Sequence, residues 1–182
     1  MNKPWKKLSL KITYKNSPYW HVEEHKVIRP DGNKGTYAHI RNGDFVVVIP
    51  LLDNDKSTYL VRQWRYPIDQ NSWELSMGKM EKDEKPLQSA KREFEEELGL
   101  KAKKWQKIGY SHLANGISNE GFSIFVARDF FPGEQKLEST ELDMIIKKVS
   151  LKKVNEMIAK GQLTDSPTIT AMYYLNLYLK KL

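Results

Sequence analysis

The stretch GKMEKDEKPLQSAKREFEEELGL, Gly78–Leu100, places a run of glutamates beside one arginine in a chain whose formal net charge is +7. Pro86 suits the first turn of a helix and Gly99 suits the position just past its end. The stretch therefore predicts a loop followed by a helix. Its apolar residues recur at helical spacing and would form the buried stripe of that helix: Leu87, Ala90, Phe94 and Leu98.

The acidic run is arranged in an unfavourable way for a helix that only has to be stable. Glu93, Glu96 and Glu97 stand at i, i+3 and i+4, so they project from one sector, while Glu95 points elsewhere. Like charges at these spacings repel, and the C-terminal half of a helix disfavours anions. Arg92 offers partial relief through an i, i+4 pair with Glu96, and Lys91 is spaced to pair with Glu95 in the same way. Three clustered glutamates taken alone more often form a solvated helix face than a metal site. If they do bind a metal, their oxygen ligands suit Mg²⁺ or Mn²⁺.

The composition limits the class of protein. A chain of 182 residues with 40% hydrophobic residues fits one domain, or one domain with a modest extra element. The absence of cysteine excludes disulfides, thiolate metal sites and cysteine nucleophiles, and it suits a reducing cytoplasm. The longest apolar run, Phe45–Leu52, is too short to span a bilayer, so we expect a soluble, cytoplasmic protein with no membrane partner. The lysines are spread along the chain, which favours a solubilising surface over nucleic-acid binding.

The order of predicted elements indicates an α/β fold. Residues 1–42 alternate polar and apolar types around a turn at Asp31-Gly32, which predicts a small antiparallel β meander. Residues 43–182 would form the main domain, starting with an apolar strand buried on both faces. A late strand is expected from Glu141 to Val149, followed by two further helices, the last of them at the C-terminus with Ser166 as its cap. Strands with three helices predict a layered α/β domain with an N-terminal antiparallel β extension.

The wider spacing of the opening stretch is a specific motif. Gly78, five residues, Glu84, seven residues and then REFEEELGL match the Nudix box without a mismatch. The chain therefore resembles the Nudix hydrolases, which cleave nucleoside diphosphates linked to another moiety. The segments LVRQWRYPI, WELSMGKME and ANGISNEGFSIFVA are similar to the ADP-ribose and nucleotide-sugar pyrophosphatase branch. The resemblance implies an α/β/α sandwich with a mixed β-sheet, and it covers nearly the whole chain.

The resemblance also implies a metal site. By motif position its ligands would be Glu93, Glu96 and Glu97, with the carbonyl of Met77 as a common further ligand. Arg92 would orient the glutamates. The implied cation is Mg²⁺, for which Mn²⁺ can substitute.

Substrate contacts follow from the same resemblance. The residues that would bind substrate are Arg65, Glu74 and Glu120, with Arg62 as a further candidate for the phosphates, and Tyr19 and Trp20 as candidates for stacking on the base. Arg62 and Glu74 are equally compatible with structural ion pairs. The general base would come from the late acidic loop, where Glu141 is favoured over Glu138.

The implied reaction is the metal-dependent hydrolysis of the pyrophosphate bond of a nucleoside diphosphate sugar, such as ADP-ribose or GDP-mannose, to a nucleoside monophosphate and a sugar phosphate. Two alternatives stay open: an RNA 5′-end pyrophosphohydrolase, motivated by the positive charge, and a nucleotide-sugar binding module without catalysis. Members of this branch are typically homodimers whose N-terminal strands are exchanged, so a homodimer with swapped strands is expected.

Overall fold

The computed structural model describes residues 4–16 and 20–180. The chain divides into two units. The first contains residues 1–44 together with 112–121, and the second contains residues 45–111 together with 122–182.

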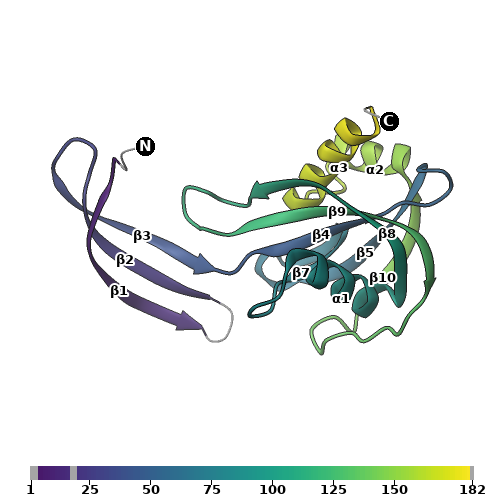
Figure 1. Ribbon diagram of the computed structural model, residues 1–182, viewed down its shortest axis with the longest axis horizontal. Coiled ribbons are helices and arrows are strands. Elements are labelled where there is room, and N and C mark those ends of the chain that lie inside the picture. Colours follow the sequence, from purple (N-terminus) through teal and green to yellow (C-terminus); the bar gives the residue numbers. More distant parts are fainter. Residues whose placement is uncertain (1–3, 17–19, 181–182) are drawn as a thin grey trace. The chain divides into compact units, whose positions relative to one another are not determined.

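The first unit is built on a three-stranded antiparallel sheet. Its strands are β1 (Lys6–Asn16), β2 (Trp20–Ile28) and β3 (Lys34–Asn42), in that order across the sheet (Figure 1). The predicted antiparallel meander is confirmed, and so is its tight turn. Gly32 has φ 83°, and its N–H donates to the carbonyl of Arg29 at 2.9 Å. A left-handed backbone at this position explains the glycine.

The second unit contains two sheets and three helices. One sheet has the strand order β7-β4-β9-β8 and the other has the order β10-β5-β6. β4 runs parallel to β9 and antiparallel to β7, so the first sheet is mixed. The strands are β4 (Phe45–Pro50), β5 (Ser57–Arg65), β6 (Gln70–Glu74), β7 (Ser76–Lys79), β8 (Leu100–His112), β9 (Gly121–Pro132) and β10 (Ile145–Ser150), and a 3₁₀ turn, η1 (Tyr66–Ile68), joins β5 to β6.

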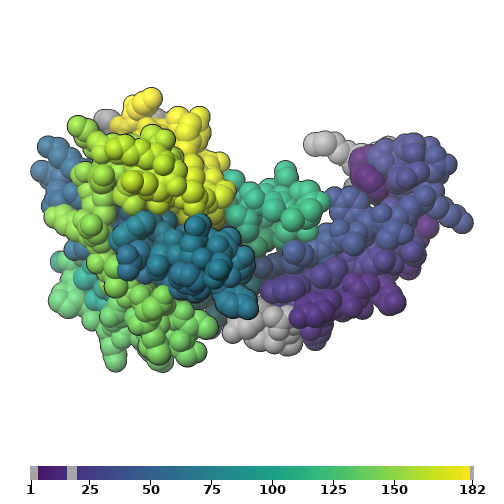
Figure 2. Space-filling view, turned by 180° about the vertical axis from the view of Figure 1, so that it is seen from behind, coloured from purple at the N-terminus to yellow at the C-terminus, as the bar shows by residue number. Residues whose placement is uncertain are grey.

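The helices cover both sides of the mixed sheet. α1 (Pro86–Leu98) lies on one side, and α2 (Leu151–Ala159) and α3 (Ser166–Leu179) lie on the other (Figure 1). Figure 2 shows α2 and α3 side by side on the surface of this unit, in yellow-green and yellow. The predicted α/β layered fold is therefore confirmed.

β4 is buried on both faces, as its continuous apolar run predicts. Val47 and Ile49 pack in a core that includes residues of α2 and α3, while Val46 and Val48 pack against α1. Because successive side chains of a strand point to opposite faces, this one strand joins the two cores. α1 is thereby packed on the central strand of the second unit.

α1 buries a narrower stripe than the sequence predicts. Ala90, Phe94 and Leu98 are buried, and the ring of Phe94 lies 5.5 Å from that of Trp105 in edge-to-face geometry. Leu87 is 39% exposed, so its assignment to the core stripe is wrong. Leu87 stands in the first turn, where helical spacing alone does not show whether the core still reaches the helix.

Two predicted boundaries also change. The side chain of Asp165, not of Ser166, caps α3, and it accepts a hydrogen bond from the N–H of Thr168 at 2.8 Å. The strand expected from Glu141 begins only at Ile145, because residues 133–144 form a loop. Among the described residues, no helix has the length and apolar character that crossing a membrane requires.

We predict that Phe94→Ala lowers the free energy of unfolding by about 3–5 kcal/mol, because the substitution leaves a cavity between α1 and the sheet. Leu87→Ala is the matched control on the same helix, and its expected loss is below about 1 kcal/mol. Urea unfolding followed by circular dichroism measures both. Equal losses in the two variants would contradict the packing described here.

Candidate active site

The main chain of β7 lies against the carboxylate of Glu93 on α1. Gly78 lies on β7 opposite Val46 of β4, and a Cβ added at Gly78 would overlap the carboxyl group of Glu93. No side chain fits between these two groups. The glycine is therefore required by the close approach of Glu93 to the main chain.

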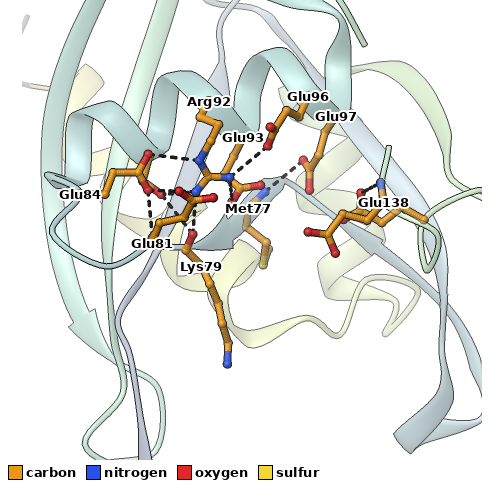
Figure 3. Close-up of polar contacts among 11 residues, drawn as sticks. Met77, Lys79, Glu81, Glu84, Arg92, Glu93, Glu96, Glu97 and Glu138 are labelled. Carbon is orange, nitrogen blue, oxygen red and sulfur yellow. Dashed lines mark hydrogen bonds and ion pairs between the residues drawn. The ribbon is translucent and has the colours of Figure 1, made fainter. Parts of the chain in front are cut away.

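Arg92 is the centre of the polar cluster (Figure 3). Its Nε and Nη2 donate to the two carboxylate oxygens of Glu84 at 3.1 and 3.0 Å. Nη1 donates to Glu93 at 2.7 Å and to Glu96 at 3.0 Å, and Nη2 also donates to the carbonyl of Lys79 at 2.8 Å. All five N–H groups of the guanidinium thus have acceptors. The predicted i, i+4 pair between Arg92 and Glu96 is confirmed. The guanidinium of Arg92 thus holds the carboxylates of Glu84, Glu93 and Glu96.

Glu97 is the most deeply buried member of the cluster, with 1% of its surface exposed. Its carboxylate accepts a hydrogen bond from the N–H of Met77 at 3.2 Å. That contact places the main chain of Met77 beside the Glu97 carboxylate, and the resemblance to the Nudix hydrolases implies a further ligand at this residue.

The electrostatics of the cluster are unfavourable without a cation. Burial raises the pKa of the Glu97 carboxyl well above its usual value, and the charges of Glu93 and Glu141 add to this effect. Burial likewise raises the pKa of Glu93 to about 7, against the lowering influence of Arg92. A buried carboxylate is costly unless a positive charge compensates it.

These residues fit a hard divalent cation. Arg92 engages one oxygen of Glu93 and one of Glu96, and each carboxylate has a second oxygen to offer. Carboxylate and carbonyl oxygens are the ligands that Mg²⁺ and Mn²⁺ prefer. The three carboxylates do not reach ligand spacing: within the described part of the chain, that spacing is found only for Glu23, His25 and His39. Binding a cation would therefore require modest side-chain rotation.

The loop after β9 is attached to the end of α1. The N–H of Lys136 donates to the carbonyl of Glu96 at 2.9 Å, and the side-chain amide of Gln135 donates to the carbonyl of Glu97 at 2.7 Å. These bonds satisfy carbonyls that a helix end leaves free. No sequence signal identifies Gln135 or Lys136, because their role depends on the path of the loop.

That attachment brings the acidic loop to the carboxylates. Burial is the main cause of the raised pKa of Glu93 and of Glu97, and the charge of Glu141 adds to it in both. The N–H of Glu138 donates to the Glu141 carboxylate at 3.0 Å, so Glu138 holds Glu141 through its main chain.

Glu95 points away from the cluster, as its helical position predicts. It pairs with Lys101 at 3.0 Å and accepts a hydrogen bond from the N–H of Glu134 at 3.2 Å. The pairing with Lys91 suggested by sequence spacing is replaced by this contact.

The two predicted phosphate-binding arginines do not come together. Arg65 donates to both oxygens of Glu74, which is 2% exposed. Arg62 is an odd number of residues away on the regular strand β5, so its side chain faces the other side, where it lies over the ring of Trp73 at 5.7 Å. The hydrogen bond to Glu74 raises the pKa of Arg65, and the charge of Asp165, a neighbour that the sequence did not indicate, adds to this effect.

The remaining residues predicted to contact substrate are in the first unit or outside the described residues. Trp20 stacks at a tilt on Tyr14, with 5.3 Å between ring centroids. Glu120 accepts a hydrogen bond from the side-chain amide of Asn42 at 2.8 Å. Tyr19 lies outside the described residues.

Known proteins are similar to this chain in sequence and in fold. A model of the NUDIX domain matches residues 43–171. The chain is 30% identical to the ADP-ribose pyrophosphatase of Bacillus subtilis (strain 168) over 149 residues, which cover 81% of this chain and 80% of that protein. It is 28% identical over 151 residues to the methanol dehydrogenase activator of Bacillus methanolicus, with 81% and 80% covered. It is 27% identical over 128 residues to the ADP-ribose pyrophosphatase of Mycobacterium tuberculosis (strain ATCC 25618 / H37Rv), with 69% and 62% covered.

The fold has a solved counterpart as well. The crystal structure of an ADP compounds hydrolase superposes with a TM-score of 0.87 at 18% identity, covering 97% of this chain and 95% of that one. The spacing from Gly78 to Leu100, the carboxylate cluster around Arg92 and the match over residues 43–171 agree: the chain belongs to the Nudix family of hydrolases.

Proposed function

We propose that this chain hydrolyses the pyrophosphate bond of a nucleoside diphosphate sugar in the presence of Mg²⁺, with ADP-ribose as the first substrate to test and GDP-mannose as the second. The products would be a nucleoside monophosphate and a sugar phosphate. The observation that carries the proposal is the cluster of half-buried carboxylates held by Arg92, with Glu93 against Gly78 and the buried Glu97 beside them. The names of the relatives from Bacillus subtilis and Mycobacterium tuberculosis support ADP-ribose as the first choice.

The cation would be held by Glu93, Glu96 and Glu97, with the carbonyl of Met77 nearby. Mg²⁺ or Mn²⁺ bound there supplies charge neutralisation at the phosphate oxygens and a more acidic bound water. Arg92 keeps two of the three carboxylates on one side of α1, so that rotation about their side-chain bonds is the adjustment a cation requires. Restricting the ligand groups in this way before binding reduces the entropy that binding costs.

Glu141 is the group we assign as general base. Its charge acts on both Glu93 and Glu97, whereas Glu138 contributes a main-chain hydrogen bond to the Glu141 carboxylate. A carboxylate held next to a cation site can accept the proton of an attacking water. Glu138 is then a positioning residue.

Arg65 is the cation we assign to the phosphates, with Glu74 orienting it through the buried ion pair. Arg62 is left out of this assignment, because its side chain lies on the opposite face of β5. Contacts of Trp20, Tyr19 and Glu120 with the base or sugar stay predictions.

We also propose that the chain forms a homodimer through residues 1–42, with these strands exchanged between protomers, and that residues 43–182 form the catalytic domain. The support is a pair of exposed apolar side chains on one face of β1, Leu10 and Ile12, which are 44% and 48% exposed and are the cross-strand partners of His25 and Glu23. Contiguous exposed apolar side chains of this kind mark interaction surfaces.

Glu97→Gln should lower kcat for ADP-ribose by at least about a hundredfold, because removing a direct ligand costs more than the roughly 10- to 100-fold that is typical of an outer-shell partner. Glutamine keeps the shape of the side chain and removes the buried charge, so the circular dichroism spectrum should not change. Glu95→Gln is the matched control and should retain activity. Loss of folded structure in Glu97→Gln would show a structural role instead.

The substrate proposal is tested by incubating the wild-type chain and Mg²⁺ with nucleotide sugars, nucleoside triphosphates and 5′-triphosphate RNA, followed by product analysis. ADP-ribose should give AMP and ribose 5-phosphate. Intact ADP-ribose and GDP-mannose beside cleaved RNA would favour the RNA alternative, and no cleavage of any substrate would favour a binding module.

Sedimentation tests the assembly. The expected mass is twice 21.3 kDa, and Ile12→Lys should shift it toward the single-chain value, whereas Lys11→Ser should not. A single-chain mass for the wild type would exclude the proposed dimer.

A further inference from the structure

The first unit contains a second group of potential metal ligands, far in sequence from the Nudix box. His21, Glu23 and His25 alternate along β2, so their side chains share one face of the sheet. His39 of β3 is the direct cross-strand partner of Glu23. Three of the four histidines of the chain are therefore gathered around one carboxylate.

The distances within this group suit a small ion. The Nε2 atom of His25 lies 2.8 Å from Oε2 of Glu23, and that of His39 lies 3.6 Å from the same oxygen. All three ligand atoms lie within 4.8 Å of one another. Tetrahedral Zn²⁺ with bonds of about 2.0–2.2 Å separates its ligand atoms by roughly 3.3 Å. Small side-chain shifts would be enough to reach that geometry.

The ligand types and their orientation also fit a metal. Imidazole nitrogens and carboxylate oxygens are both common ligands of Zn²⁺. The ring of His21 hydrogen-bonds Oε1 of Glu23 at 3.0 Å, which fixes the orientation of the carboxylate whose other oxygen, Oε2, lies near His25 and His39. A carboxylate oriented by an outer imidazole is the arrangement that tunes metal sites.

The group is also accessible. His25 and His39 line a pocket of about 440 Å³ in the first unit, together with Trp5, Tyr37 and the loop residues Gly116 and Ser118. The rings of His25 and His39 pack edge to face with 4.8 Å between centroids, which keeps both imidazoles in place beside that pocket. An ion could therefore enter without unfolding of the sheet.

We propose that Glu23, His25 and His39 form a Zn²⁺ site, with His21 orienting Glu23 and a fourth coordination position open to the pocket. Two imidazoles and one carboxylate suit Zn²⁺, whereas Mg²⁺ prefers all-oxygen sites. The bound ion clamps β2 to β3. This site is independent of the carboxylate cluster on α1 and of the reaction assigned to it.

The test uses the full chain without a histidine tag, stripped with a chelator and titrated with Co²⁺ and Zn²⁺. The expected result is one Co²⁺ per chain with the visible absorption of a four-coordinate site, displaced by Zn²⁺ and unaffected by excess Mg²⁺. The Glu93→Gln/Glu97→Gln double variant removes the other candidate site and should give the same spectrum. A spectrum lost in that double variant would assign the ion to the Nudix box and overturn the proposal.

His25→Ala and His39→Ala should each weaken Zn²⁺ binding by at least about tenfold. His112→Ala, which changes the fourth histidine, should bind as the wild type does. Circular dichroism of the metal-free variants checks that each is folded. If a histidine variant is unfolded, the Co²⁺ titrations of the wild type and of the Glu93→Gln/Glu97→Gln double variant decide whether the proposed site binds the ion. Absence of Co²⁺ binding in the wild type, or binding unchanged in both His25→Ala and His39→Ala, would show that the group is a hydrogen-bond network only.

Discussion

The structure of the candidate active site depends on the interaction between one guanidinium and the acidic groups around it. Arg92 donates to Glu84, Glu93 and Glu96 at once and also to the carbonyl of Lys79. Without it, carboxylates that share one sector of a helix would repel one another and rotate into solvent. With it, the chain keeps them together, yet no described residue forms an ion pair with the buried Glu97, whose pKa burial raises. The cluster is therefore incompletely neutralised, which is the condition under which a divalent cation binds well.

The rest of the second unit keeps this cluster in place. β4 is buried on both faces, so α1 rests on a strand that is itself fixed by the core beneath α2 and α3. The loop after β9 is bonded to the last carbonyls of α1 through Gln135 and Lys136, and it delivers Glu141 to the carboxylates. Rigid support of this kind holds reactive groups within the small tolerances that catalysis requires.

The arrangement of the carboxylates was predictable from sequence where it depends on local geometry. Glu93, Glu96 and Glu97 lie in one sector of α1 because of helical periodicity. The close approach of Glu93 to the main chain of Gly78 depends on the packing of α1 against β7. Long-range features were not predictable. The opposite orientations of Arg62 and Arg65 follow from strand alternation, but only once the strand register is known. The exposure of Leu87 depends on how far the core beneath α1 extends toward the first turn of that helix. The histidine group had a visible signal, the alternation of His21, Glu23 and His25, but its closure by His39 required the pairing of β2 with β3.

The most direct test is the change in melting temperature that Mg²⁺ causes, measured as a function of pH. It tests whether the carboxylates around Glu93 and Glu97 bind a cation. A carboxyl whose folded pKa is raised makes the metal-free protein lose stability as pH rises from the unfolded value of 4.5 to the folded value, which for Glu93 is about 7. Mg²⁺ binds the ionised form, so it should raise the melting temperature clearly at pH 8 and little at pH 5. An equal shift at both pH values, or no shift at pH 8, would contradict this account.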